Sequence, residues 1–139
     1  RSQYVAILPL SGDHSACPAF TPEAGSLDRA RRAEALGFCG DIHSAIGALF
    51  APDLEPAVRE RFVAMAHRRL GQFEALLTEG RDYWLEAGFT QADALAFVIL
   101  SWAEPLKLDL SPYVKAVALR DRVAARPAVQ AALKEEGLA

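Results

Sequence analysis

Residues 89–106 read FTQADALAFVILSWAEPL, and this segment begins with the clearest helix-start signal in the chain. Thr90 and Asp93 lie three positions apart at its start, the spacing of a capping box in which each side chain accepts a hydrogen bond from the other residue's backbone N–H. Ten uncharged residues follow between Asp93 and Glu104. A membrane span needs about 20 such residues, and a helix without a polar face must be enclosed by protein. We therefore expect residues 91–106 to form the central helix of the domain.

The segments before this stretch show the spacing of amphipathic helices. Ser26 can cap a helix whose apolar positions recur every three or four residues as far as Pro52. Pro56 suits the first turn of a second helix, and its apolar stripe continues to Gly80, a residue type common at helix ends. Two long amphipathic helices in series are expected to pack antiparallel.

The two ends of the chain carry different signals. Pro112 and Pro127 mark the starts of two further helices. The packing positions expected in the first of them are Val114, Val117, Ala118 and Val123. Residues 4–10 form a short apolar piece, and residues 11–25 are rich in Gly, Pro and Ser, which predicts a loop or linker. We therefore expect a domain boundary near residue 24.

The composition agrees with a helical protein. Of 139 residues, 27 are Ala and 18 are Leu, whereas Val, Ile and Thr together number 15. Ala and Leu favour helices and β-branched residues favour strands, so we predict an all-α bundle. The apolar content of 52% excludes a disordered chain. A net charge of −3 with only three lysines argues against a non-specific nucleic-acid binder, which needs a basic surface.

The cysteine content and the first residues indicate a reducing compartment. Two cysteines, Cys17 and Cys39, are too few for a disulfide framework in a chain of this length. Residues 1–4 lack the basic flank and apolar core of a secretory signal. We expect a cytoplasmic protein that binds neither membranes nor nucleic acid.

Few residues have the arrangement of a catalytic or metal site. His43 follows Cys39 by one helical turn, so the two side chains share a helix face. A zinc site would need two more ligands at suitable spacing, so we expect a packed cysteine beside a partly exposed histidine and no metal. Asp93 is expected to cap its helix rather than to act as a catalytic acid, and Trp102 to lie in the core or to line a pocket. The arginine runs at 29–32 and 68–69 are expected to form solvated faces.

Two motifs resemble the C-terminal helical domain of the glutathione S-transferases, most closely the bacterial beta class. They are the F-T-x-A-D box at 89–93 and R-P-A-V-Q-x-A-L-x-x-E-G-L at 126–138. In addition, residues 26–52 resemble the first long helix of that class. Residues 2–8, SQYVAIL, resemble the end of the family's N-terminal thioredoxin-like domain. The resemblance thus implies that residues 1–25 are the end of that domain plus a linker, and residues 26–139 the helical domain.

This resemblance implies an enzyme that conjugates the thiol of glutathione, its co-substrate, to apolar electrophiles in detoxification, with no further cofactor. Gln3 and Tyr4 fall at glutathione-binding positions of the family. His43 matches a helix histidine that reaches glutathione in beta-class enzymes. Ile46 and Trp102 map near the hydrophobic-substrate pocket.

The chain also departs from the family pattern. Ser44 stands where a Lys usually follows the helix histidine, which removes one charge-assisted contact to the tripeptide. Tyr4 stands where a small residue usually lies. The family's thiol-activating Ser, Tyr or Cys lies near the start of the thioredoxin-like domain and is not expected in this chain.

Two interpretations remain open. In the first, the chain is the helical part of a transferase-like enzyme, present as a homodimer or docked to a thioredoxin-like domain; its first residue, Arg rather than Met, motivates this interpretation. In the second, the helical domain acts alone as a ligand-binding or protein-interaction module. We expect the chain by itself to be inactive or nearly so.

Overall fold

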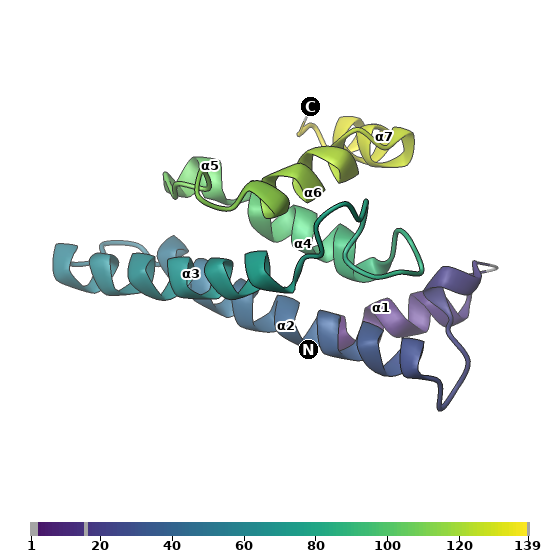
Figure 1. Cartoon of the computed structure of the whole chain (residues 1–139). Helices are drawn as coiled ribbons and strands as arrows, with labels where there is room; N and C mark the ends of the chain where they lie inside the picture. The colour runs from purple at the N-terminus through teal and green to yellow at the C-terminus, as the bar shows by residue number, and fades with distance from the viewer. Residues whose placement is uncertain (1–2, 16, 139) are drawn as a thin grey trace.

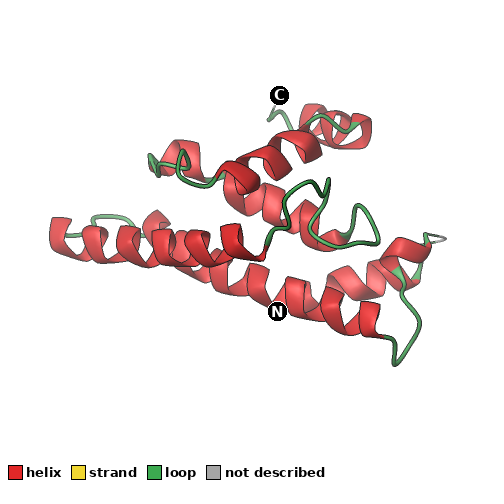
Figure 2. Ribbon diagram, in the orientation of Figure 1, coloured by secondary structure: helices red, strands yellow, loops and turns green. Residues whose placement is uncertain are grey.

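The computed structural model describes residues 3–15 and 17–138, and all regular elements within this part are helices (Figures 1 and 2). The prediction of an all-α bundle is therefore confirmed. The remaining residues 1, 2, 16 and 139, including the first residue of the segment SQYVAIL, lie outside the described part. The elements are α1 (Tyr4–Asp13), a 3₁₀ turn (Pro18–Phe20), α2 (Leu27–Gly47), a 3₁₀ turn (Ala48–Phe50), α3 (Pro56–Leu76), α4 (Gln91–Ser101), α5 (Ala103–Leu106), α6 (Val114–Ala124) and α7 (Pro127–Glu135).

The two long helices α2 and α3 pack side by side and run in opposite directions, as expected (Figure 1). The Ser26 hydroxyl accepts a hydrogen bond from the Arg29 N–H at 3.2 Å and so caps α2. Helix α3 ends at Leu76, earlier than Gly80. Leu77 takes an extended conformation, and only 6% of its surface is exposed. The helix therefore ends where the Leu77 side chain is buried, and not at Gly80.

Helix α4 lies at the centre, in contact with α1, α2, α5 and α6 (Figure 1). Two details differ from the sequence prediction. The expected helix over 91–106 is interrupted at Trp102, because Pro105 has no N–H to donate and its ring crowds the carbonyl of Ser101. In addition, Val98 is 46% exposed, so this apolar helix is not enclosed on every face.

The capping box at the start of α4 is present as predicted. Asp93 is fully buried, and its Oδ2 accepts hydrogen bonds from the Thr90 N–H at 2.7 Å and the Thr90 hydroxyl at 2.8 Å. Its Oδ1 accepts from the Trp84 N–H at 2.8 Å. Burial raises the pKa of Asp93, and these hydrogen bonds oppose that effect. The carboxylate therefore links the preceding loop to the first turn of the central helix.

Helix α6 presents a different face to the core from the one that the sequence predicted. Val123 is fully buried and Val117 partly buried, but Val114 is 71% exposed and Ala118 also lies on the outer face. The residues that face the core are Ala116, Leu119 and Val123. Glu74 of α3 accepts hydrogen bonds from the N–H groups of Lys115 and Ala116, both at 2.9 Å. This cap from another helix sets which face of α6 points inward.

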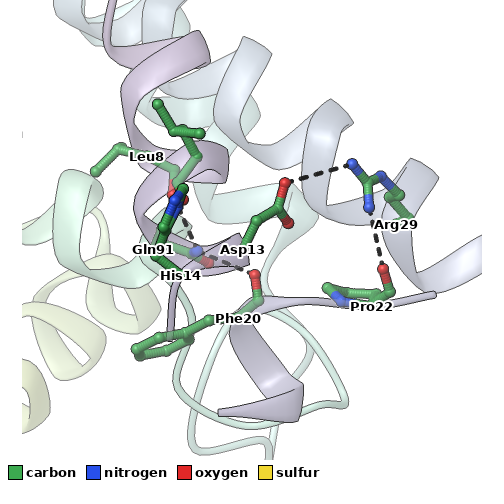
Figure 3. A network of polar contacts seen from close by, with 8 residues as sticks. Leu8, Asp13, His14, Phe20, Pro22, Arg29 and Gln91 are labelled. Carbon is green, nitrogen blue, oxygen red and sulfur yellow. Dashed lines mark hydrogen bonds and ion pairs between the residues drawn. The ribbon is translucent and has the colours of Figure 1, made fainter. Parts of the chain in front are cut away.

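The N-terminal segment is more ordered than the predicted loop. Helix α1 continues to Asp13 and packs against α2 and α4. Gln91 of α4 donates from Nε2 to the carbonyl oxygens of Leu8 at 3.3 Å and Phe20 at 3.2 Å (Figure 3). A Cβ at Gly12 would collide with that amide and with the Phe20 carbonyl, so a glycine is required where the two segments meet.

Within the described residues, no helix combines the length and apolar character needed to cross a bilayer.

Candidate ligand site around His43

The predicted helix histidine lies where three segments meet. The His43 ring lies 5.8 Å from the Tyr4 ring of α1 and 5.1 Å from the Trp102 ring at the end of α4, measured between centroids. The Trp102 ring also lies edge-on to Phe50, at 5.4 Å. His43 and Trp102 are only partly buried. The structure therefore brings together two of the predicted glutathione-binding residues and one of the predicted pocket residues.

A partly buried imidazole between aromatic rings suits recognition of a polar ligand. Its ring nitrogens can donate or accept a hydrogen bond, while the flanking rings hold the orientation of the side chain. The aromatic pairs place the ring planes at 36° to Tyr4 and 66° to Trp102. The site thus combines one hydrogen-bonding group with apolar walls.

Tyr4 closes one side of this site against α2. A Cβ at Gly40 would collide with the Tyr4 hydroxyl, so glycine lets α1 approach α2 closely. Burial raises the pKa of Tyr4, and the nearby Cys39 and Asp41 raise it further. The hydroxyl therefore remains a neutral phenol at physiological pH, able to donate a hydrogen bond but not to act as a phenolate base.

Cys39 shares a helix face with His43 but belongs to the core. It is fully buried, and its Sγ donates to the Ala92 carbonyl at 3.6 Å. Burial, together with the Asp93 carboxylate, raises its pKa to about 12. A thiol in this environment is not a nucleophile. The described residues contain no cluster of three or more His, Cys, Asp or Glu able to hold a metal ion.

The other predicted positions are more dispersed. Gln3 is exposed and precedes α1, where its carbonyl accepts from the N–H groups of Ala6 and Ile7. Ile46 is completely buried in the core, so its side chain reaches no surface pocket in this structure. Ser44, next to His43 in sequence, lines a shallow pocket between α2 and α3 instead.

Trp102 connects the His43 site to a larger apolar groove. The groove has a volume of about 610 Å³ and lies between α4, α5, α6 and α7. Its apolar lining includes Phe97, Val98, Trp102, Pro105 and Leu133. This volume falls within the range of small-molecule sites. An apolar compound in the groove would contact Trp102, whose ring packs against His43.

Sequence reasoning missed several members of this site, among them Phe50 and Val98. Phe50 was not singled out, although it follows His43 by seven residues, a spacing that returns to the same face after two helical turns. Val98 was assigned to the core because the whole segment is apolar. Its exposure could not be read from a stretch without polar residues.

Comparison with known proteins agrees with the resemblance found in the sequence. Residues 40–136 match the family model described as glutathione S-transferase, C-terminal domain. The chain is 30% identical to a glutathione S-transferase, GstA, of Escherichia coli O157:H7, over 96% of this chain and 67% of that protein.

Solved structures show the same similarity. The bacterial beta-class glutathione S-transferase of Sphingomonas chungbukensis superposes with a TM-score of 0.90 at 31% identity, covering 100% of this chain and 69% of that one. A sphingomonad glutathione S-transferase complexed with glutathione gives 0.89 at 34% identity, over the same shares. This chain therefore belongs to the glutathione S-transferase family, and residues 40–136 match its C-terminal domain, of the bacterial beta-class type.

Proposed function

We propose that this chain supplies the helical half of an enzyme that conjugates glutathione to apolar electrophiles. The observation that carries the proposal is His43, held between Tyr4 and Trp102, because Trp102 also lines an apolar groove. His43 would contact glutathione and Trp102 would contact the electrophile. The sphingomonad relative, whose structure contains glutathione, supports glutathione as the ligand.

The group that activates the thiol is proposed to lie outside this chain. Such a group must stabilise a thiolate or remove its proton. Among the described residues, burial leaves Cys39 as an inert thiol and raises rather than lowers the pKa of Tyr4. This matches the proposed division in which residues 1–25 end a thioredoxin-like domain and residues 26–139 form the helical domain.

Calorimetric titration of the chain with glutathione tests the proposal. Loss of one hydrogen bond to a charged group costs about 1.5–3 kcal/mol, so His43→Ala should weaken binding by at least tenfold. His14→Ala is the matched control, because His14 is exposed and its Nδ1 lies 2.8 Å from the Leu10 carbonyl oxygen. Equal affinity in both variants, or no binding at millimolar glutathione, would refute a glutathione site built by these residues.

A non-catalytic role as an interaction module is the second candidate. Three apolar side chains of α1 are exposed, Val5 at 45%, Ile7 at 45% and Leu10 at 59%. Exposed apolar side chains of this kind suit a protein partner, for which a thioredoxin-like domain is the occupant we propose. Binding of that domain, produced separately, should be lost in Leu10→Asp but retained in Leu138→Asp, a change at another exposed leucine.

We also propose a homodimer through the outer face of α2 and α3. A groove of about 570 Å³ lies there, and its lining includes Phe38, Trp84 and Leu76, of which Leu76 is 50% exposed. Light scattering should give twice the chain mass, and Leu76→Arg should give the monomer. A monomeric unsubstituted chain at high micromolar concentration would refute this assembly for the helical half alone.

A further inference from the structure

The segment between α1 and α2 is held from two sides. Gln91 holds the carbonyl groups of Leu8 and Phe20, as described above (Figure 3). On the other side, Arg29 donates from Nη1 to the Pro22 carbonyl at 3.4 Å, and its Nη2 lies 3.9 Å from Asp13 Oδ2 (Figure 3). One further charged side chain near this segment takes part in none of these contacts.

That group is Arg32, one turn further along α2. The sequence predicted a solvated side chain here, and this prediction is wrong, because Arg32 is only 3% exposed. Its Nη1 is fully buried and has no hydrogen-bond partner. Burial is the main cause that lowers its pKa, and nearby Arg29 adds to the effect. A buried donor without a partner costs free energy and calls for an explanation, commonly a bound water or ion.

Arg32 lines a small cavity at the junction of three segments. Its volume is about 20 Å³, and its walls come from Pro22 in the connection, Asp28 and Arg32 in α2, and Glu86 and Thr90 in the loop before α4. A cavity needs about 10–15 Å³ to hold one water molecule, together with two to four polar partners. Both conditions are met here.

We propose that this cavity is a binding site for a single water molecule, which accepts a hydrogen bond from Arg32 Nη1 and donates one toward the carboxylate of Asp28. Water fits better than an anion for two reasons. The charged side chains that line the cavity balance, because Asp28 and Glu86 stand against Arg31 and Arg32, so nothing favours a negative ligand over a neutral one. The volume suits one water, and a water can serve the donor and the acceptor together.

The bound water has a structural consequence beyond satisfying Arg32. Both of its hydrogen-bond partners lie in α2, and the water fills the space between α2, the loop before α4 and the connection that follows α1. The connection in turn holds α1, which carries Tyr4 against His43. The inference does not depend on whether the chain binds glutathione.

Crystallography of the full chain at about 1.5 Å resolution, with Arg32→Met as the variant, tests occupancy. The expected result is a water peak within hydrogen-bond distance of Nη1, lost in the variant. An empty cavity would overturn the proposal. So would an anomalous peak at this position in crystals soaked in bromide, which would assign the site to an anion.

Hydrogen exchange tests the consequence in solution. The amide of Phe20, bonded to the Cys17 carbonyl, should exchange about tenfold faster in Arg32→Met and unchanged in Arg68→Met, an exposed arginine of α3. Asp28→Ala, at an exposed position, should accelerate the same amide if Arg32→Met does not fold. Unchanged exchange in both Arg32→Met and Asp28→Ala would show that no water in this cavity supports the connection.

Discussion

Replacing Asp93 by alanine should destabilise the domain more than the loss of any ordinary helix cap. The carboxylate accepts three hydrogen bonds, from Trp84 N–H, Thr90 N–H and the Thr90 hydroxyl, at 2.7–2.8 Å, and it is fully buried. Alanine would leave two backbone N–H groups without partners. Each buried, unsatisfied group costs about 1–3 kcal/mol, so the expected loss is about 2–6 kcal/mol out of a total stability of about 5–15 kcal/mol.

The neighbouring substitutions should follow in a fixed order. Asp93→Asn keeps one acceptor oxygen and should lose about half as much. Thr90→Ala removes a single cap and should cost about 1 kcal/mol. Asp121→Ala, at an exposed ion pair with Arg120, should change stability by no more than about 0.5 kcal/mol.

Urea unfolding at pH 7, followed by far-ultraviolet circular dichroism, measures these differences. The assay is valid if all variants show the same dependence of unfolding free energy on urea. A loss below about 1 kcal/mol for Asp93→Ala would refute the reasoning. A larger loss for Thr90→Ala than for Asp93→Ala would also refute it, because the carboxylate would then not be the group that joins the loop to α4.

Three further changes test other contacts. Above pH 9 the native state keeps a proton on Cys39 that the unfolded state loses, because the folded pKa is about 12; the unfolding free energy should therefore fall by about 1.4 kcal/mol per pH unit up to about pH 12, and Cys39→Ala, but not Cys17→Ala, should remove this slope. Gly40→Ala should lower the melting temperature by displacing Tyr4, whereas Gly37→Ala, with open space around it, should raise stability by up to about 1 kcal/mol. Glu74→Ala should cost about 1–3 kcal/mol in urea unfolding, less than Asp93→Ala, because the two hydrogen bonds to α6 N–H groups that it removes are only part-buried, and Glu74→Gln should recover part of that loss.

The features that sequence predicted correctly are local ones. The caps at Ser26 and Thr90 depend on residues within three positions of each other, and both are present. Helix starts at Pro56 and Pro127 follow from the fixed backbone geometry of proline. Each of these signals acts through atoms that the chain brings together without folding, so a sequence pattern is sufficient to find them.

The features that sequence missed depend on contacts between distant residues. Glu74 caps a helix about 40 positions away, and it sets the rotation of α6 against the apolar pattern that favoured Val114. The sequence around Gln91 is typical of a surface residue at a helix start, yet its amide donates a hydrogen bond to the Leu8 carbonyl of α1. Arg32 lies in an arginine run that normally faces solvent. For all three, the folded arrangement decides the role of a side chain whose local pattern is uninformative.

The candidate site shows the same distinction within one helix face. Cys39 and His43 are one turn apart, and periodicity alone assigns them the same environment. The Cys39 thiol packs against α4, where it donates to the Ala92 carbonyl, and it is buried. Tyr4 and Trp102 flank the His43 imidazole, which remains partly exposed. Gly40, between them in sequence, permits the approach of Tyr4. Packing against α4 therefore makes the cysteine unavailable to a ligand while the histidine stays accessible, and because Tyr4 of α1 flanks only the imidazole, any change that moves α1 should alter the His43 site before it alters the core.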